Sequence, residues 1–297
     1  MKYDPEFETD VAVVGGGPAG TALATLLVQM GHKCCLFERD EFPRYHIGES
    51  LIPNTYSLFD KLGLLPALRQ SDFPRKHSVR FVSPEGTESD PFYFSERIAG
   101  EPAVTWQVER GEFDRMMLDH ARSNGVIIHK GSHVEKVLFK NGCANGVMFR
   151  QNGSDPLETK AKVVVDASGR ATLLGNQLNL KRPVPSLKKS SIWGYYRHGA
   201  RLPGIDAGET TIYRIHKDGW FWDIPLPDDI VSVGLVDETD ALFEDMNDPE
   251  FSFGAFAKRY PEQKAELIDC LMGDVIKDMS QFRESLGRMT APPPSLR

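Results

Sequence analysis

The stretch that decides the fold is Val11-Ala12-Val13-Val14-Gly15-Gly16-Gly17-Pro18-Ala19-Gly20, close to the start of the chain. Its four apolar residues predict a short buried strand, and the glycines predict a tight turn. A helix is expected from about Ala19 to Met30, ended by Gly31. A second buried strand is expected over 33–37. This strand–turn–helix–strand order predicts an α/β fold with a parallel sheet.

The spacing of Gly15, Gly17 and Gly20 fits G-x-G-x-x-G in the context that dinucleotide binding requires. The first glycine makes the turn, the second admits a pyrophosphate, and the third lets the helix pack on the strand. Pro18 and Ala19 open the helix, whose free N–H groups face the phosphates. Glu38, at the end of the second strand, is placed to accept hydrogen bonds from ribose hydroxyls. Because it is an acid, it disfavours a 2′-phosphate on that ribose. The alternative is a glycine-rich turn without a ligand.

Composition excludes several classes of protein. The chain has 297 residues, of which 40% are hydrophobic and 26% charged, with a net charge of −7. An acidic chain is a poor ligand for nucleic acid, so no nucleic-acid partner is expected. The four cysteines have no metal-ligand spacing, and no metal site is expected. Neither a secretory signal nor a membrane span is recognisable, which predicts a cytoplasmic protein.

Three further segments indicate the kind of dinucleotide. They are Pro43–Pro53 (PRYHIGESLIP), Gln107–Arg115 (QVERGEFDR) and Lys162–Arg170 (KVVVDASGR). With the glycine motif, they resemble the FAD-dependent monooxygenases that have the hydroxybenzoate-hydroxylase type of fold. The resemblance implies a Rossmann-like FAD-binding domain interleaved with an antiparallel β substrate domain, and FAD as the cofactor.

The same resemblance implies which residues surround the FAD. They are Gly15, Gly17, Pro18, Ala19, Gly20, Glu38, Arg39, Arg44, Ile47, Gly48, Glu49, Ser50, Gln107, Arg110, Val134, Asp166, Ala167, Ser168 and Gly169. For Ser50 an alternative role is to cap a helix that begins near Pro53.

Two of the four tryptophans, Trp220 and Trp222, stand one residue apart in Gly219-Trp220-Phe221-Trp222-Asp223-Ile224-Pro225. In a strand they would lie side by side on one face and form an aromatic wall. The W-x-W-x-I-P pattern resembles the flavin-dependent halogenases, the tryptophan-halogenase-like branch of the FAD-dependent monooxygenase superfamily. The related geranylgeranyl reductases usually carry tyrosine and phenylalanine there. The alternative is that both tryptophans are ordinary core residues.

The resemblance also implies a catalytic lysine downstream of the G-E-S segment, at the entrance of a strand. Lys76 occupies that position, so the expected catalytic residues are Lys76, Trp220 and Trp222. An ammonium can hold hypohalous acid beside a substrate, whereas a neutral amine can capture it as a haloamine. Desolvation would lower the pKa of the lysine toward the neutral form. The alternative is a solvated lysine in the basic loop 75–77.

The expected domains are discontinuous. Residues 1–75 and 105–180 form the FAD-binding domain, and 76–104 with 181–250 form the substrate sheet. Strands are expected over 190–197, 210–215, 220–224 and 230–236, and a hairpin over 81–94 joins them. Residues 251–297 are expected to form a helical segment and a proline-rich tail. Because the family's later Gly-Asp motif is missing, the chain is expected to lack the C-terminal part, by truncation or divergence.

These features predict an FAD-dependent halogenase that uses FADH2 from a separate flavin reductase, O2, and chloride or bromide. An electron-rich phenolic or pyrrole-like substrate, free or attached to a carrier protein, is expected. One alternative is an NAD(P)H-fed FAD monooxygenase or a geranylgeranyl-reductase-like oxidoreductase. The other is a non-catalytic FAD-binding remnant.

Overall fold

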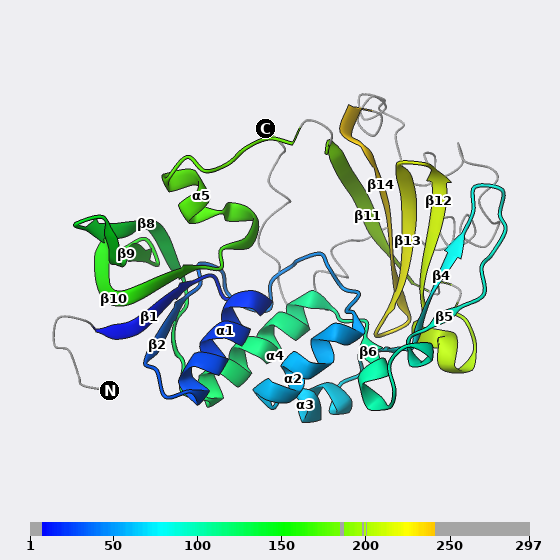
Figure 1. Cartoon of the computed structure of the whole chain (residues 1–297), viewed down its shortest axis with the longest axis horizontal. Coiled ribbons are helices and arrows are strands. Elements are labelled where there is room, and N and C mark those ends of the chain that lie inside the picture. The colour runs from blue at the N-terminus through cyan, green and yellow to red at the C-terminus, as the bar shows by residue number, and fades with distance from the viewer. Residues whose placement is uncertain (1–7, 185–186, 198, 200, 241–297) are drawn as a thin grey trace. The chain divides into compact units, whose positions relative to one another are not determined.

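The computed structural model describes residues 8–184, 187–197, 199 and 201–240 (Figure 1). These residues belong to two compact units, each described by itself below. The first comprises residues up to His46 together with Phe59–Ala67 and Arg110–Pro183, and the second comprises Ile47–Leu58, Leu68–Glu109 and the chain from Val184 onward. The helical segment expected over 251–297 lies outside the described residues.

The first unit is built on a six-stranded sheet with the order β7-β2-β1-β10-β9-β8. Strands β7, β2, β1 and β10 run parallel, whereas β9 pairs antiparallel with both β10 and β8. Their bounds are β1 Thr9–Val14, β2 Cys34–Phe37, β7 Ile127–His129, β8 Ser132–Lys140, β9 Cys143–Gln151 and β10 Leu157–Asp166. The two strands expected around the glycine motif, β1 and β2, therefore lie side by side and parallel, which confirms the α/β fold class.

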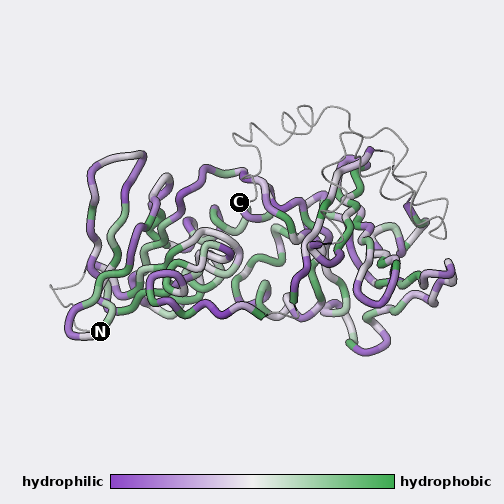
Figure 2. The backbone as a smooth tube through the Cα atoms, turned by 90° about the horizontal axis from the view of Figure 1, so that it is seen from above, coloured by the Kyte–Doolittle hydropathy of each residue, from purple (hydrophilic) through white to green (hydrophobic). Residues whose placement is uncertain are grey.

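Two helices, α1 (Pro18–Gln29) and α4 (Arg110–Ser123), pack on one face of this sheet. Their apolar residues meet alternate residues of the parallel strands, because successive strand side chains point to opposite faces. Cys34 faces the helices while Cys35 faces the layer formed by β8 and β9, and both thiols are buried. Figure 2 shows hydrophobic residues on the strands and helices and hydrophilic residues on many of the connecting loops.

The second unit carries the other six-stranded sheet, in the order β11-β14-β13-β12-β4-β5. The bounds are β4 Ser78–Val82, β5 Phe92–Tyr93, β11 Lys189–Arg197, β12 Thr210–His216, β13 Gly219–Leu226 and β14 Ile230–Glu238. The four expected strands and the added hairpin are thus confirmed. The pairs are antiparallel except that β4 runs parallel to β12. The chain makes a long excursion through the first unit between these two strands, so no hairpin dictates an antiparallel pair.

Short elements complete the described chain. Strand β3 (Arg75–Lys76) pairs with β6 (Thr105–Trp106) just before β4 begins. The remaining helices are α2 Tyr56–Leu62, α3 Leu65–Gln70, α5 Leu173–Gln177 and the 3-10 turns η1 Pro53–Thr55, η2 Phe94–Glu96, η3 Glu101–Ala103, η4 Gly169–Ala171 and η5 Gly204–Gly208. Within the described residues, every helix is too short or too polar to cross a membrane.

Candidate functional site

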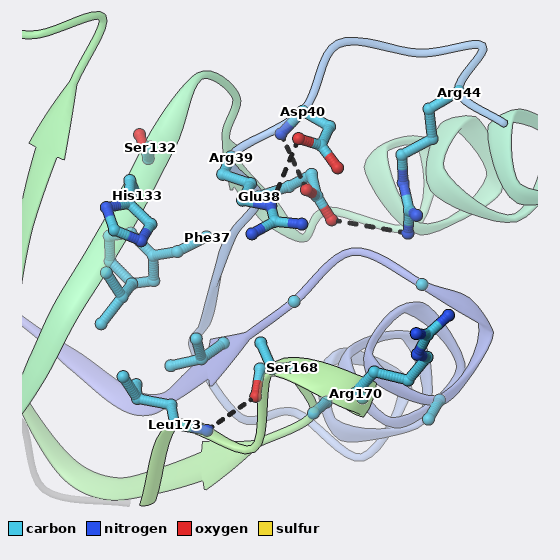
Figure 3. Close-up of a pocket in the computed structure, with 18 of the residues that line it drawn as sticks. Phe37, Glu38, Arg39, Asp40, Arg44, Ser132, His133, Ser168, Arg170 and Leu173 are labelled. Atoms are coloured by element: carbon cyan, nitrogen blue, oxygen red, sulfur yellow. Dashed lines mark hydrogen bonds and ion pairs between the residues drawn. The ribbon is translucent and has the colours of Figure 1, made fainter. Parts of the chain in front are cut away.

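A pocket of about 710 Å³ opens in the first unit at the carboxyl ends of β1 and β2 (Figure 3). In an open α/β sheet this edge is where ligands bind, because the loops there are free to vary. The glycine loop and the start of α1 form one wall, and Glu38–Asp40 form another. The turn after β10 and the start of β8 complete the lining.

The glycine loop is shaped for close contact with a ligand. Gly15 has a φ of +106°, and a Cβ on it would collide with the carbonyl oxygen of Ala167. A Cβ on Gly20 would collide with the carbonyl oxygen of Gly15, so the third glycine allows the helix to pack on the turn. Gly17 has an ordinary φ of −72°, and its missing Cβ leaves space at the pocket surface. The roles predicted for the first and third glycines thus match the packing.

Glu38 lies buried directly after β2 and belongs to the wall that Glu38–Asp40 form. Its two carboxylate oxygens accept backbone N–H bonds from Gly16 at 2.7 Å and Asp40 at 2.8 Å. The Arg44 guanidinium lies 3.8 Å from Glu38 and 3.6 Å from Asp114. Each carboxylate oxygen has a second lone pair, so Glu38 remains able to accept a ribose hydroxyl.

Positive charge gathers at one side of the pocket. Figure 3 shows Arg44 and Arg170 at that side, near the start of α1, and His46 also lines it. Burial lowers the pKa of His46, and the nearby guanidinium groups of Arg110, Arg44 and Arg170 lower it further. The arginines and the helix N-terminus together favour a dianionic group such as a diphosphate.

The turn after β10 is held by Asp166. Its carboxylate accepts hydrogen bonds from the Ser168 N–H at 3.0 Å, the Ser168 hydroxyl at 2.5 Å and the Leu174 N–H at 2.8 Å. Burial opposes the ionisation of Asp166, but these hydrogen bonds outweigh it and lower its pKa. Asp166 therefore shapes the turn, while Ala167, Ser168 and Gly169 line the pocket.

The pocket gathers eleven of the residues expected around FAD: Gly15, Gly17, Pro18, Ala19, Glu38, Arg39, Arg44, Val134, Ala167, Ser168 and Gly169. Gly20, Asp166 and Arg110 are not among the lining residues. Arg110 donates to Asp114 at 2.8 and 3.0 Å. The other five, Ile47, Gly48, Glu49, Ser50 and Gln107, belong to the second unit.

Sequence reasoning missed twelve lining residues: Val14, Phe37, Asp40, His46, Ser132, His133, Glu135, Arg170, Ala171, Leu173, Asn176 and Gln177. Arg170 follows the Asp-Ala-Ser-Gly turn directly, so its position was a usable signal. Ser132 and His133 reach the pocket because the start of β8 lies against the end of β2, where the Ser132 N–H donates to the Glu38 carbonyl oxygen at 2.8 Å. No local sequence pattern predicts this contact.

In the second unit, Lys76 is buried, with 5% of its surface exposed. Its ammonium nitrogen lies 2.7 Å from the Ser50 hydroxyl and 3.5 Å from the Leu51 carbonyl oxygen. It also lies 5.6 Å from the centre of the Phe94 ring. Burial lowers the pKa of Lys76 to about 8. The alternative of a solvated lysine is therefore wrong, because pairing of β3 with β6 takes this side chain out of water.

Polar side chains surround Lys76. Ser50 Oγ lies 2.9 Å from Thr210 Oγ1, and the Gln107 side-chain amide donates to Thr210 Oγ1 at 2.7 Å. The alternative role of Ser50 as a helix cap is wrong. The helical turn begins after Ile52, which has no side-chain cap, and Ser50 bonds across to β12 instead. Its neighbour Glu49 accepts a hydrogen bond from the Tyr195 hydroxyl at 2.6 Å.

Trp220 and Trp222 share one face of β13, as the strand alternation predicts, while Phe221 is fully buried on the opposite face. The Trp222 indole N–H donates to Ser232 Oγ at 3.1 Å. Trp222 pairs with Gly234 of β14, and a Cβ on Gly234 would overlap the six-membered ring of the indole. The glycine thus provides the space in which this tryptophan lies.

We expect Gly234→Ala to destabilise the fold by about 1–3 kcal/mol, because the new methyl group overpacks against the Trp222 ring. Urea denaturation measures the change. In a Trp222→Leu background the same alanine should cost clearly less, since the ring it meets is gone. Equal costs in the two backgrounds would contradict the contact.

Comparison with known proteins identifies the family. The chain matches the FAD binding domain family over residues 8–220 and belongs to it. It is 32% identical over 252 residues to a 1H-pyrrole-2-carbonyl-[peptidyl-carrier protein] chlorinase of Pseudomonas fluorescens strain Pf-5, covering 78% of this chain and 56% of that protein. It is 35% identical over 231 residues to a tryptophan 2-halogenase of Chondromyces crocatus, covering 77% and 43%.

Solved structures agree with these relatives. The myxobacterial chondrochloren halogenase CndH, described as an FAD-dependent halogenase, matches with a TM-score of 0.74 and 31% identity over 90% of this chain and 62% of that one. The flavin-dependent halogenase CmlS matches with a TM-score of 0.77 and 30% identity, over 89% and 47%. The predicted resemblance to flavin-dependent halogenases is therefore confirmed. The chain spans about half the length of the curated relatives it matches.

Proposed function

We propose that this chain binds FAD and works as a flavin-dependent halogenase on an electron-rich aromatic substrate. The observation that carries the proposal is the buried Lys76, whose pKa is lowered to about 8, in the same unit as the Trp220–Trp222 strand. Because this pKa lies close to pH 7, the lysine can exchange between a hydrogen-bonding ammonium and a nucleophilic amine near that pH. The relatives that are named as halogenases support the proposed class of reaction.

The residues of the first unit fit FAD. At Gly15 and Gly20 the turn leaves no space for a side chain, because a Cβ there would collide with backbone atoms. The N-terminus of α1, with Arg44 and Arg170, suits the diphosphate. Glu38 suits the ribose. When bound and reduced, FAD supplies with O2 the oxidising power that turns chloride or bromide into hypohalous acid.

Lys76 is the residue proposed to handle that acid. As an ammonium it donates a hydrogen bond to the hypohalous oxygen and holds the halogen in place. As an amine it forms an N–halogen bond, with loss of water made from the hydroxide of HOX and the amine proton. Burial excludes water from the lysine, which limits hydrolysis and escape of the oxidant. Trp220 and Trp222 are proposed to form the wall across which only this small oxidant passes.

The substrate proposed is a phenol or a pyrrole, and a carrier-bound pyrrole is favoured by two relatives. One is the Pseudomonas chlorinase, and the other is a 1H-pyrrole-2-carbonyl-[peptidyl-carrier protein] brominase of Pseudoalteromonas luteoviolacea, 31% identical over 249 residues. A separate flavin reductase is the proposed source of FADH2. Among the described residues no cluster of three or more His, Cys, Asp or Glu side chains is placed to hold a metal.

The test supplies the protein with FADH2, O2 and either chloride or bromide. Free phenols, free pyrrole carboxylates and pyrrole loaded on a carrier protein are compared, and mass spectrometry looks for hydrogen replaced by halogen. Halogenation in any arm supports the proposal. Rapid flavin reduction by NAD(P)H without a reductase, and no halogenated product, would favour the monooxygenase or reductase alternative. Failure to bind FAD would favour the remnant.

We expect Gly17→Ala to fold normally but to weaken FAD binding by at least about tenfold. Its φ of −72° suits alanine, and the added Cβ would meet only the Arg44 guanidinium, at 3.4 Å. The methyl group instead fills the space through which a pyrophosphate reaches the backbone. Flavin fluorescence titration measures the affinity. Gly175→Ala in α5, where a Cβ meets nothing closer than 3.5 Å and which lies outside the pocket lining, is the matched control.

A further inference from the structure

The hydrogen bonds around Lys76 have a defined direction that begins at Gln107. The fully buried Gln107 amide nitrogen donates to the Gly208 carbonyl oxygen at 2.9 Å and to Thr210 Oγ1 at 2.7 Å. A carbonyl oxygen can only accept, so the nitrogen of the amide must face Gly208. This backbone contact fixes which end of Gln107 meets Thr210.

Thr210 passes the direction on. Because its hydroxyl oxygen accepts from Gln107, its single hydrogen is available for Ser50 Oγ, 2.9 Å away. Ser50 Oγ in turn lies 2.7 Å from Lys76 Nζ. When each hydroxyl donates onward, Gln107, Thr210 and Ser50 form a chain of donors that ends on the lysine nitrogen.

This chain of hydrogen bonds is satisfied to a different degree by the neutral and the protonated form of Lys76. With a neutral amine, the Ser50 O–H donates to the nitrogen lone pair, and each bond in the chain strengthens the next. With an ammonium, Gln107 and Lys76 both donate into the hydrogen-bond chain, so Thr210 and Ser50 share one hydrogen bond and the other hydroxyl hydrogen has no acceptor within that chain. The chain therefore favours the neutral amine.

Charged groups on the neighbouring elements have other partners. On η5 and just after it, Asp206 accepts from the Tyr93 hydroxyl at 2.9 Å, and Glu209 accepts from Ser78 at 2.7 Å and Arg80 at 2.8 Å. Glu49 accepts from Tyr195, Arg75 on β3 is exposed, and burial lowers the pKa of His77, with Arg75 lowering it further. For Lys76 itself, burial is the cause of the lowered pKa.

We propose that Thr210 is a positioning residue for Lys76, aiming the Ser50 hydroxyl at Nζ so that the lysine is kept as the amine that captures an electrophilic halogen. Gln107 sets the direction of the Thr210 hydroxyl. This inference rests on the function proposed for Lys76, but the hydrogen-bond chain acts on the lysine whether or not halogenation occurs.

The test compares Thr210→Val, which keeps the shape but removes the hydroxyl, with Thr210→Ser, which keeps the hydroxyl. The pKa of Lys76 is followed by NMR in protein carrying 13C-labelled lysine, with the Lys76→Met variant identifying the signal. We expect valine to raise the pKa by about half a unit or more, the worth of one hydrogen bond. Serine should restore the wild-type value. A pKa that is equal in all three proteins, or lower with valine, would overturn the proposal.

A second variant and a second readout complete the test. Gln107→Leu removes the first donor and is expected to raise the pKa of Lys76 by less than Thr210→Val does. It takes the place of Thr210→Val if that variant does not fold. In halogenation assays, the pH at which the rate rises should be higher for Thr210→Val than for the wild type. For Thr210→Ser it should be unchanged. A pKa shift in proteins that never halogenate would refute the proposed function while leaving the hydrogen-bond role standing.

Discussion

Lys76→Ala is expected to lower the yield of halogenated product by at least about 100-fold, the scale on which a positioned catalytic group acts. FAD binding should be unchanged, because Lys76 is not among the residues that line the pocket proposed for FAD. Oxidation of FADH2 by O2 should also continue. What is lost is the nitrogen proposed to hold hypohalous acid, so halide oxidation would continue while substrate halogenation would fail.

Mass spectrometry of the product and a chemical trap for free hypohalous acid measure the two effects together. Arg75→Ala is the matched control, since it removes an exposed cation from the same two-residue strand. Arg75→Ala should halogenate like the wild type. If Lys76→Ala kept full halogenation, the role assigned to Lys76 would be refuted.

Lys76→Met is expected to make the protein more stable while it removes that activity. Burial lowers the pKa of Lys76 from 10.5 to about 8 in the folded state. Keeping a proton there at pH 7 costs about 3 kcal/mol relative to the unfolded chain. Methionine has a similar shape without the charge, so the cost disappears.

The pH dependence gives this prediction its sign. Between pH 8 and 10.5 the unfolded lysine keeps its proton and the folded lysine has lost it, so raising the pH favours the folded state. Wild-type stability should therefore rise across that range, and this rise should be absent in Lys76→Met. Urea denaturation at pH 7 and pH 9.5 measures both. Lys136→Met, at an exposed position of β8, should change neither. Equal pH dependence in wild type and Lys76→Met would contradict the burial of an ionisable amine.

The sequence was most informative where structure is local. Gly15, Gly17 and Glu38 lie within one strand–turn–helix–strand unit, so spacing alone placed them around one pocket. The face shared by Trp220 and Trp222 followed from strand alternation, which depends on neighbours in the chain. The six strands of the second sheet could be located for the same reason.

Contacts between distant segments could not be read in this way. Ser50, Gln107 and Thr210 meet beside Lys76 because a bridge joins Ser50 to Gln107 and the start of β12 comes up against both. No periodicity links these positions. The resemblance assigned Ser50 and Gln107 to the cofactor, a role that stays a prediction, whereas the structure places their side chains in the bonds around the lysine.

The burial of the two adjacent thiols of β2 affects how well the protein resists oxidation. Hypohalous acids oxidise thiolates readily, and the thiolate is the reactive form of cysteine. Burial raises the pKa of Cys34 to about 12 and also raises that of Cys35, so neither carries appreciable thiolate at pH 7. Because one sulfur faces the helices and the other the β8–β9 layer, an oxidant that escapes would have to open the core to reach them. Strand β2, next to the strand that carries the glycine turn, would thereby be protected against the oxidant that the proposed reaction forms.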